Sequence, residues 1–338
     1  MKNIMAMAVL VLAVNTVRAA APVPGQPALE QLGQAAPALT APGPLPAASG
    51  PVKPLKAGRD LTADYQRIYK ASDRLMGRNE KAELRKYKVL LVAGFLSNNA
   101  TAPASFLGLE IRKATYFQTQ IKILKALGVD YALTPIESEQ TPEYNAGIVG
   151  HEIAISEKPV IIFCHSKGGL DTLAALIEYR GLRSKVRGVV TIQTPYFGSP
   201  VADYVLGHRA LTQISSLVLE ANSGTIAALR SLETGVRQKY YDSNKAAIEE
   251  IESEIPMLSF ASWEETPRYP AAAEPFREAI SKALGGFKND GYVPLASAVL
   301  PGTDYILAKE LGHLETVIGN SLPAFTNTLL LMITAGGR

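Results

Sequence analysis

Short apolar runs recur along the chain and alternate with stretches whose apolar residues fall at helical spacing. The runs are rich in β-branched residues and too short for helices, which is typical of strands buried on both faces of a sheet. Strands separated by helices favour a mostly parallel central sheet with helices on both faces. The pattern therefore predicts an α/β fold, with strands at residues 88–92, 129–133, 159–163, 186–192, 256–262 and 304–308.

The segments between these runs predict helices. Asp60 is a plausible N-cap for a helix to about Leu75. The residues from Phe117 to Leu127 repeat at helical spacing, and Gly128 provides a stop. Further helices are expected over residues 141–155 and from Ser166 to near residue 181.

The stretch from about residue 198 to 256 departs from the strand–helix alternation. It is mainly helical in pattern and carries charged segments such as "AAIEEIESE", so we interpret it as a helical, lid-like insertion. The segment "LPAFTNTLLLMITA" near the end is apolar but shorter than the ~20 residues that span a bilayer. We expect it to form a packed helix.

The N-terminal residues have a different character. Lys2 precedes an apolar run from Ile4 to Val14, and small residues then suit cleavage after Ala19, which is the layout of a secretory signal peptide. Residues 20–57 hold nine of the 22 prolines and have no apolar period, which indicates a Pro/Ala-rich linker. We therefore expect a signal peptide at 1–19, a linker at 20–57 and a folded domain at 58–338. The protein is expected in the periplasm or outside the cell.

Composition narrows the partners. A net charge of +3, with no dense basic cluster, gives no reason to expect nucleic acid binding. Cys164 is the only cysteine, so no intramolecular disulfide can form. Its place at the end of an apolar strand favours a small buried side chain over a reactive thiol.

Ser166 lies between a predicted strand and a predicted helix, in "FCHSKGGLD". A serine hydroxyl needs a base to accept its proton and donors to hold an oxyanion, and a strand-to-helix elbow exposes it to both. The segment from Cys164 to Gly168 matches the Gly-x-Ser-x-Gly elbow, except that cysteine replaces the first glycine. Ser166 is therefore the predicted nucleophile.

The order serine, acid, histidine selects the partners of Ser166. His313 follows the last predicted strand and is the expected base, whereas His208 lies in the insertion and His165 is expected to pack or bond locally. Asp290, in the turn "FKNDGYVP", is the expected acid, and Asp304 is its competitor at the start of a strand.

Two backbone N–H groups are expected to bind the oxyanion. Lys167 follows the nucleophile and supplies one of them. The loop "VAGFLSNN" follows the first central strand, and the N–H of Phe95 is the second expected donor. We expect the Lys167 side chain to reach solvent.

These blocks resemble, in order, those of the α/β-hydrolases, and specifically the bacterial secreted triacylglycerol lipases. "LLVAGFLS" is similar to their oxyanion loop, "FCHSKGGLD" to their Gly-His-Ser-x-Gly-Gly and "VVTIQTPYFGSPVADYV" to their Thr-Pro-His-x-Gly-Ser segment. "LSFASW", "NDGYVP" and "GHLETV" resemble their later strand, acid and base segments. The resemblance covers about residues 88–317. It implies an α/β-hydrolase fold with Ser166, Asp290 and His313 as the triad, and Phe95 and Lys167 as oxyanion donors.

Two features of those lipases, a structural calcium ion and a lid disulfide, do not carry over fully to this chain. Those lipases often hold a structural calcium ion through an acidic residue two positions after the histidine, here Glu315. The chain shows no convincing second ligand, so we assign no metal and expect no cofactor. Their lid disulfide cannot form here. Residues 214–232 have apolar residues at helical spacing, which fits either a cover over an acyl pocket or simple packing on the sheet.

The sequence leaves three functions to compare. The first is a secreted serine carboxylester hydrolase, a lipase acting on acylglycerols through an acyl-enzyme and contacting lipid surfaces. The second keeps this chemistry but changes the substrate, as a depolymerase of a polyester such as polyhydroxyalkanoate or as an acyltransferase. The third is a non-catalytic binding protein on a hydrolase scaffold, because a fold alone does not prove activity.

Overall fold

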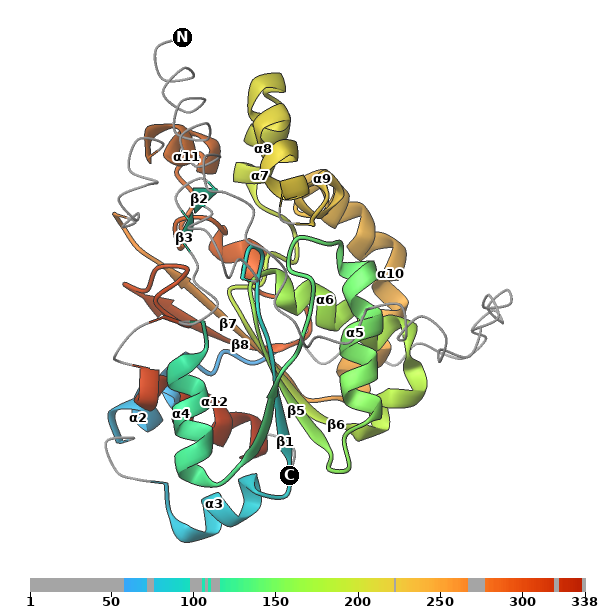
Figure 1. The fold of residues 1–338 in the computed structure, drawn as a ribbon. Coiled ribbons are helices and arrows are strands. Elements are labelled where there is room, and N and C mark those ends of the chain that lie inside the picture. The colour runs from blue at the N-terminus through green and yellow to red at the C-terminus, as the bar shows by residue number, and fades with distance from the viewer. Residues whose placement is uncertain are drawn as a thin grey trace, which may run out of the picture.

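A six-stranded parallel sheet forms the centre of the molecule (Figure 1). The computed structural model describes residues 58–71, 76–97, 105–106, 109–110, 116–221, 223–266, 277–318 and 322–335. The strand order is β4-β1-β5-β6-β7-β8, and each neighbouring pair is parallel. The α/β class and the parallel sheet predicted from the sequence are confirmed. The expected signal peptide and linker lie outside the described residues.

The strands lie where the apolar runs predicted them. Their bounds are β1 Lys88–Val92, β4 Asp130–Leu133, β5 Val160–His165, β6 Val186–Ile192, β7 Met257–Trp263 and β8 Asp304–Lys309. Alternate residues of β5 enter different cores, because successive side chains of a strand point to opposite faces. Ile162 and Cys164 belong to one buried cluster, while Ile161 and Phe163 belong to the other.

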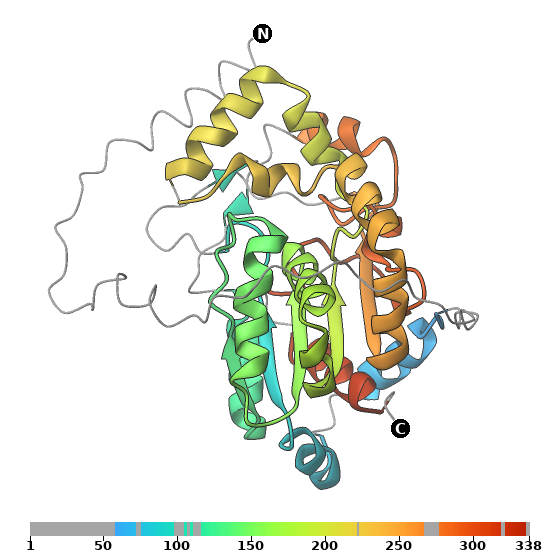
Figure 2. The same cartoon turned by 90° about the vertical axis from the view of Figure 1, so that its right-hand side faces the viewer.

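Helices cover both faces of the sheet (Figures 1 and 2). One face carries α5 (Pro142–Ala154), α6 (Lys167–Glu178) and α10 (Thr234–Glu254), which pack on residues such as Leu90 and Val189. The other carries α2 (Thr62–Ala71), α4 (Gln118–Leu127) and α12 (Leu322–Ala335). Local signals set several ends: Thr141 accepts a hydrogen bond from Tyr144 N at 3.3 Å, and Gly128 ends α4 with φ of 69°.

The stretch expected to be one insertion divides into two parts. The helices α7 (Pro200–Leu206), α8 (Arg209–Ala221) and α9 (Ile226–Arg230) lie beyond one edge of the sheet, at the top of Figure 2. We call these three helices the cap. The helix α10 instead runs along the sheet beside α6, and its Ile248 and Ile251 are buried in the main core. It is the crossover helix between β6 and β7, so the alternation of strands and helices resumes earlier than the sequence indicated.

Some elements were not predicted. They are α3 (Arg78–Leu84), α11 (Arg277–Leu284), the two-stranded pair β2 (Ser105–Phe106) and β3 (Leu109–Glu110), and two 3₁₀ turns at Arg180–Lys185 and Leu295–Ala298. All are short, and short elements have weak periodic signals. Within the described part of the chain, no helix combines the length and apolarity needed to cross a bilayer.

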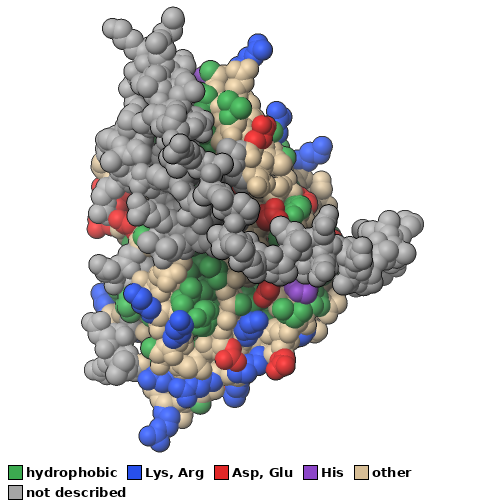
Figure 3. All heavy atoms as spheres, in the orientation of Figure 1, with side chains coloured by type: hydrophobic (Ala, Val, Ile, Leu, Met, Phe, Trp, Pro, Cys, Tyr) green, Lys and Arg blue, Asp and Glu red, His purple; other side chains and the backbone are tan. Residues whose placement is uncertain are grey.

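Charged side chains are mixed on the face shown in Figure 3. Lys and Arg gather toward the end that carries α3 and α4, and Asp and Glu lie among them. Ion pairs there join Lys86 to Glu83 at 2.8 Å and Lys158 to Asp130 at 2.6 Å. These exposed pairs contribute little to stability, because water screens them.

Candidate active site

Ser166 occupies the sharp turn between β5 and α6. It is the N-cap of α6 and has φ of 53° and ψ of −131°, an uncommon conformation for a residue with a side chain. Hydrogen bonds hold the turn: Ser166 N donates to Ile192 O at 2.8 Å, and Gly169 N donates to Ser166 O at 3.0 Å. The strain is therefore balanced by the surrounding structure, and the turn lifts the hydroxyl to the carboxyl edge of the sheet.

The glycines after Ser166 are required by close packing. A Cβ added to Gly168 would lie 2.3 Å from the carbonyl oxygen of Ala93, and one added to Gly169 would lie 2.0 Å from Thr194 Oγ1. Cys164, in place of the first glycine of the pattern, is fully buried. Burial raises the pKa of its thiol to about 12, so it stays protonated near neutral pH.

Three side chains that are distant in sequence meet at this edge. Ser166 Oγ lies 3.0 Å from His313 Nε2, and His313 Nδ1 lies 2.8 Å from Asp290 Oδ2. Each follows a different strand: Ser166 follows β5, Asp290 lies in the long connection after β7, and His313 follows β8. The structure thus brings together the nucleophile, acid and base candidates of the sequence.

Asp290 is held in one orientation. Its Oδ1 accepts hydrogen bonds from Tyr292 N at 3.0 Å and Val293 N at 2.8 Å, which leaves Oδ2 for His313. A carboxylate only accepts, so His313 Nδ1 carries the proton and Nε2 is free to accept one from Ser166. The arrangement favours the tautomer that a general base requires.

The alternative residues lie elsewhere. Asp304 bonds Arg59 at the start of β8, at the opposite end of that strand from His313. His208 lies between α7 and α8 and donates to Tyr204 O at 2.6 Å. Glu315, the candidate calcium ligand, accepts from Gly312 N at 3.1 Å and so braces the base. Among the described residues, no three acidic, His or Cys side chains are grouped so that they could hold a metal ion.

The two expected oxyanion donors flank Ser166. Lys167 is the first residue of α6, where N–H groups have no partner inside the helix. Phe95 shares with Ser166 the lining of one cavity. The loop is close to the nucleophile, because a Cβ added to Gly94 would lie 2.8 Å from Ser166 Cβ.

The side chain of Lys167 corrects one expectation. It was expected to reach solvent, but it is fully buried and its Nζ lies 2.8 Å from Asp171 Oδ1. Asp171 Oδ2 also accepts from Asn145 Nδ2 at 3.0 Å, which ties α6 to α5. The spacing of Lys167 and Asp171 was the available signal for this pair, since residues four apart share a helix face. Burial followed from the packing of α5 on α6.

Comparison with known proteins identifies the architecture. No protein-family model and no curated protein matches the chain. A metagenomic carboxyl esterase, MGS0156, superposes with a TM-score of 0.60 at 19% identity, over 75% of this chain and 76% of that one. The mature form of Bacillus licheniformis lipase BlEst2 gives 0.56 at 21% identity, over 73% and 92%. The chain has the α/β-hydrolase fold. At such identities the likeness shows the fold alone.

An apolar cavity adjoins Ser166 at the carboxyl edge of this α/β-hydrolase fold. It measures about 70 Å³ and lies between Phe95, the cap and the turn that follows Asp290. The cap contributes Val201, Ala202 and Leu229, and Leu232 follows it. The cap helices therefore form one wall of the space beside Ser166.

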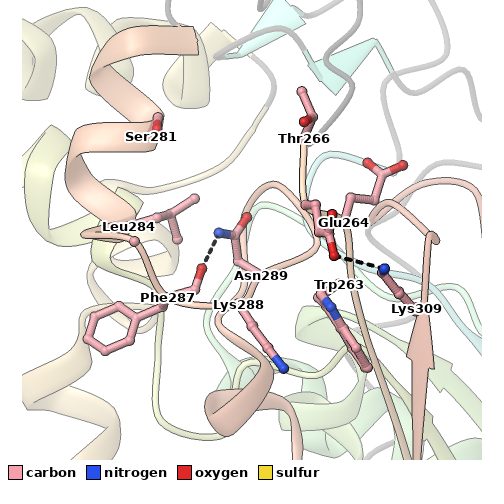
Figure 4. Close-up of a pocket in the computed structure, with 11 residues that line it drawn as sticks. Trp263, Glu264, Thr266, Ser281, Leu284, Phe287, Lys288, Asn289 and Lys309 are labelled. Atoms are coloured by element: carbon pink, nitrogen blue, oxygen red, sulfur yellow. Dashed lines mark hydrogen bonds and ion pairs between the residues drawn. The ribbon is translucent and has the colours of Figure 1, made fainter.

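A larger cavity lies on the other side of the turn that contains Asn289 and Asp290 (Figure 4). It measures about 500 Å³ and is lined by residues of α11, by the end of β7, by the segments that follow these two elements, and by Lys309. Lys309 Nζ pairs with Glu265 at 2.8 Å, and Lys288 lies 5.0 Å from the centre of the Trp263 ring. Ser166 and His313 are not among its lining residues, so it is separate from the space beside the nucleophile.

Sequence reasoning missed two residues that lie around the candidate site. Gln193 Nε2 donates to Gly312 O at 3.2 Å, and Tyr116 Oη accepts from Gly94 N at 2.9 Å. Gln193 directly follows β6 at the carboxyl edge of the sheet, and this position was the available signal for it. Tyr116 carried no spacing signal, because its contact depends on how a loop folds back.

Proposed function

We propose that the protein is a serine carboxylester hydrolase that forms an acyl-enzyme on Ser166. The observation that carries this proposal is the hydrogen-bonded chain from Ser166 through His313 to Asp290. The fold, shared with proteins described as a carboxyl esterase and a lipase, supports it. A non-catalytic binding protein would have no need of a strained serine aligned with a histidine and a carboxylate.

The proposed reaction has two halves. Ser166 Oγ attacks the ester carbonyl carbon while its proton moves to His313 Nε2, and the oxyanion faces the N–H groups of Phe95 and Lys167. The alcohol leaves with the proton from His313. Water then attacks the acyl-enzyme, giving its proton to His313, and Ser166 recovers a proton as the carboxylic acid is released. Asp290 stabilises the imidazolium ion in both halves.

We infer that the substrates are esters with short acyl groups, acylglycerols among them. The cavity of about 70 Å³ beside Ser166 is apolar, and it is far below the roughly 300–1,000 Å³ of common ligand pockets. A long acyl chain requires the cap to move or the chain to lie outside. Hydrolysis of p-nitrophenyl butyrate is expected to exceed that of the palmitate ester at least about tenfold in kcat/KM. The Leu229→Ala variant should narrow this ratio by enlarging the cavity.

The test of the function uses the purified full chain. Ser166→Ala should lower kcat roughly 10⁴-fold or more, whereas Ser253→Ala, at an exposed position on α10, should leave it unchanged. A fluorophosphonate should label wild-type protein at Ser166, as located by peptide mass spectrometry. Retained hydrolysis in Ser166→Ala would refute this nucleophile, and absence of both hydrolysis and labelling would favour a binding protein.

Substrate assays separate the related activities. Emulsified triacylglycerols of different chain length test the lipase, and a polyhydroxyalkanoate film tests the depolymerase. Addition of an alcohol acceptor tests acyl transfer, because a transferase forms the new ester in preference to the free acid. We place the activity in the periplasm or outside the cell, on the strength of the N-terminal signal pattern.

A further inference from the structure

His165 lies next to Ser166 in sequence but is buried behind it, with 1% of its surface exposed. Both ring nitrogens are engaged. Nε2 lies 2.8 Å from the carbonyl oxygen of His313, and Nδ1 is hydrogen-bonded to the hydroxyl of Tyr116. The two imidazole rings of His165 and His313 are 4.7 Å apart, centre to centre. The neighbour of the nucleophile therefore touches the backbone of the base.

The direction of each hydrogen bond follows from its partners. A carbonyl oxygen can only accept, so His165 carries its proton on Nε2 and Nδ1 must accept from the Tyr116 hydroxyl. That hydroxyl in turn accepts from Gly94 N at 2.9 Å. The chain thus runs from Gly94 N–H through Tyr116 and His165 to His313 O, and each member is oriented by the next.

One end of this chain is the oxyanion loop. Because the N–H of Gly94 donates to Tyr116, the peptide plane between Ala93 and Gly94 has one orientation. Leu96 has φ of 61°, so the loop turns sharply just after Phe95. The anchored peptide lies directly before the peptide that carries the Phe95 N–H, the oxyanion donor proposed above.

The loop that carries His313, at the other end of these hydrogen bonds, is also held by contacts that do not involve Tyr116. Gln193 Nε2 bonds Gly312 O at 3.2 Å, and the Thr316 hydroxyl bonds Gln193 Oε1 at 2.7 Å. These bonds hold the residues around His313 without Tyr116. Loss of the Tyr116 hydroxyl should therefore disturb the oxyanion loop more than the base.

This series of hydrogen bonds also requires a neutral His165. Burial lowers the pKa of His165 well below its ordinary value, and the nearby His313 lowers it further. A protonated ring would point Nδ1–H at the Tyr116 hydroxyl and remove its acceptor. The environment that buries the ring thus also preserves its ability to accept.

We propose that Tyr116 and His165 are positioning residues that orient the Phe95 N–H relative to His313 and so stabilise the transition state without touching the substrate. This inference rests on the proposed ester hydrolase function. The hydrogen bonds of Tyr116 and His165 connect the oxyanion loop to the loop that carries His313, and both loops take part in the proposed reaction.

The test compares Tyr116→Phe with Tyr87→Phe in the full chain. Each substitution removes one hydroxyl from a buried tyrosine. The Tyr87 hydroxyl donates to Glu83 at 2.8 Å. Tyr87 directly precedes β1 and so lies at the end of the sheet opposite to Ser166. We expect Tyr116→Phe to lower kcat on p-nitrophenyl butyrate about 10- to 100-fold per titrated active site, with KM within about twofold. Tyr87→Phe should leave kcat unchanged.

An alkyl boronic acid supplies a readout that a purely structural role would not move. Its affinity depends on the oxyanion donors, so its Ki should rise with Tyr116→Phe by about the factor lost in kcat/KM. His165→Gln can keep a donor to the His313 carbonyl oxygen, but it has no acceptor at the place of Nδ1, where the Tyr116 hydroxyl donates, so its kcat and Ki should match those of Tyr116→Phe. The double variant should lose little more, because both changes break one link.

The outcomes are separable. Unchanged kcat and Ki in Tyr116→Phe, or fully additive losses in the double variant, would overturn the positioning role. Either single variant carries the kinetic test if the other does not fold, as judged by circular dichroism. Absence of wild-type hydrolysis, or full activity in Ser166→Ala, would overturn the proposed function itself and this inference with it.

Discussion

At the scale of residues, the geometry of the site is fixed because each buried polar atom has only one or two possible hydrogen-bond partners. Asp290 divides its two oxygens, one accepting from two backbone N–H groups and the other from His313. An amide at position 290 would present either a donor or a weaker acceptor to His313. The tautomer of the imidazole is therefore decided by one carboxylate oxygen.

Asp290→Asn should lower kcat about 10⁴-fold with little change in the fold, because His313 would lose the preference for a proton on Nδ1. Asp304→Asn is the matched control, since Asp304 bonds the exposed Arg59 and lies away from Ser166. Steady-state kinetics on p-nitrophenyl butyrate check both. Equal activity in the two variants would show that Asp290 has no part in the reaction.

At the scale of elements, the contact of α5 with α6 supports the serine elbow. Two glycines of α5 have different surroundings. A Cβ at Gly150 would lie 2.7 Å from the ring of Tyr179, whereas a Cβ at Gly147 would meet only the Tyr179 hydroxyl at an ordinary 3.6 Å. Gly150 therefore allows the close approach of α5 and α6, whereas Gly147 only adds backbone freedom to the unfolded chain.

Gly147→Ala should raise the free energy of unfolding by about 0.5–1 kcal/mol, because alanine favours the helix. Gly150→Ala should lower it by about 1–2 kcal/mol net, since overpacking against Tyr179 exceeds the same helical gain. Urea denaturation followed by circular dichroism measures both. Equal shifts of the same sign would contradict the packing argument.

Within α10, Glu252 is an acid in an unfavourable place. Its carboxylate lies against Gly302, and neither oxygen has a hydrogen-bond partner among the described residues. Burial, and then the charge of Glu249, raises the pKa of Glu252 to about 8. The folded state therefore holds a proton between its ordinary pKa and about 8 that the unfolded state releases.

Stability should consequently fall as pH rises from about 5 to 8 through this group, because the folded state binds the extra proton. Glu252→Gln removes the buried charge and should raise stability at pH 8 by about 1–2 kcal/mol, allowing for partial exposure, with little effect near pH 4. Thermal melts across this range test it. Glu157→Gln, at an exposed position, is the control, and parallel pH profiles for the two variants would refute the assignment.

At the scale of the whole molecule, a parallel sheet gathers distant segments at one edge. Phe95, Ser166, Asp290 and His313 follow four different strands and meet at the carboxyl ends. The cap then encloses the apolar space beside Ser166.

The export prediction concerns the full chain. Expressed with its own N-terminus in a bacterium, the protein should be recovered outside the cytoplasm beginning at Ala20, because the apolar run ends in a cleavage pattern at Ala19. Intact mass spectrometry of fractionated cells measures this. Recovery of the uncleaved chain in the cytoplasm alone would contradict it.

The sequence by itself determined the strands, the long helices and the parallel class, because buried runs and helical spacing are local patterns. It also selected Ser166, Asp290 and His313 as candidates, since the elbow glycines and the chain order limit the choice. It placed the Lys167 side chain in solvent and merged α10 with the cap, because burial of a charge and the docking of a helix depend on distant partners.

Only the tertiary structure decided which polar atoms pair. The link from Gly94 through Tyr116 and His165 to His313 joins segments that share no motif or spacing. The size of the cavity beside Ser166 was also beyond the sequence, because it depends on where the cap rests. Local patterns define elements, whereas contacts between elements are chosen by close packing and by the need to satisfy every buried hydrogen-bonding group.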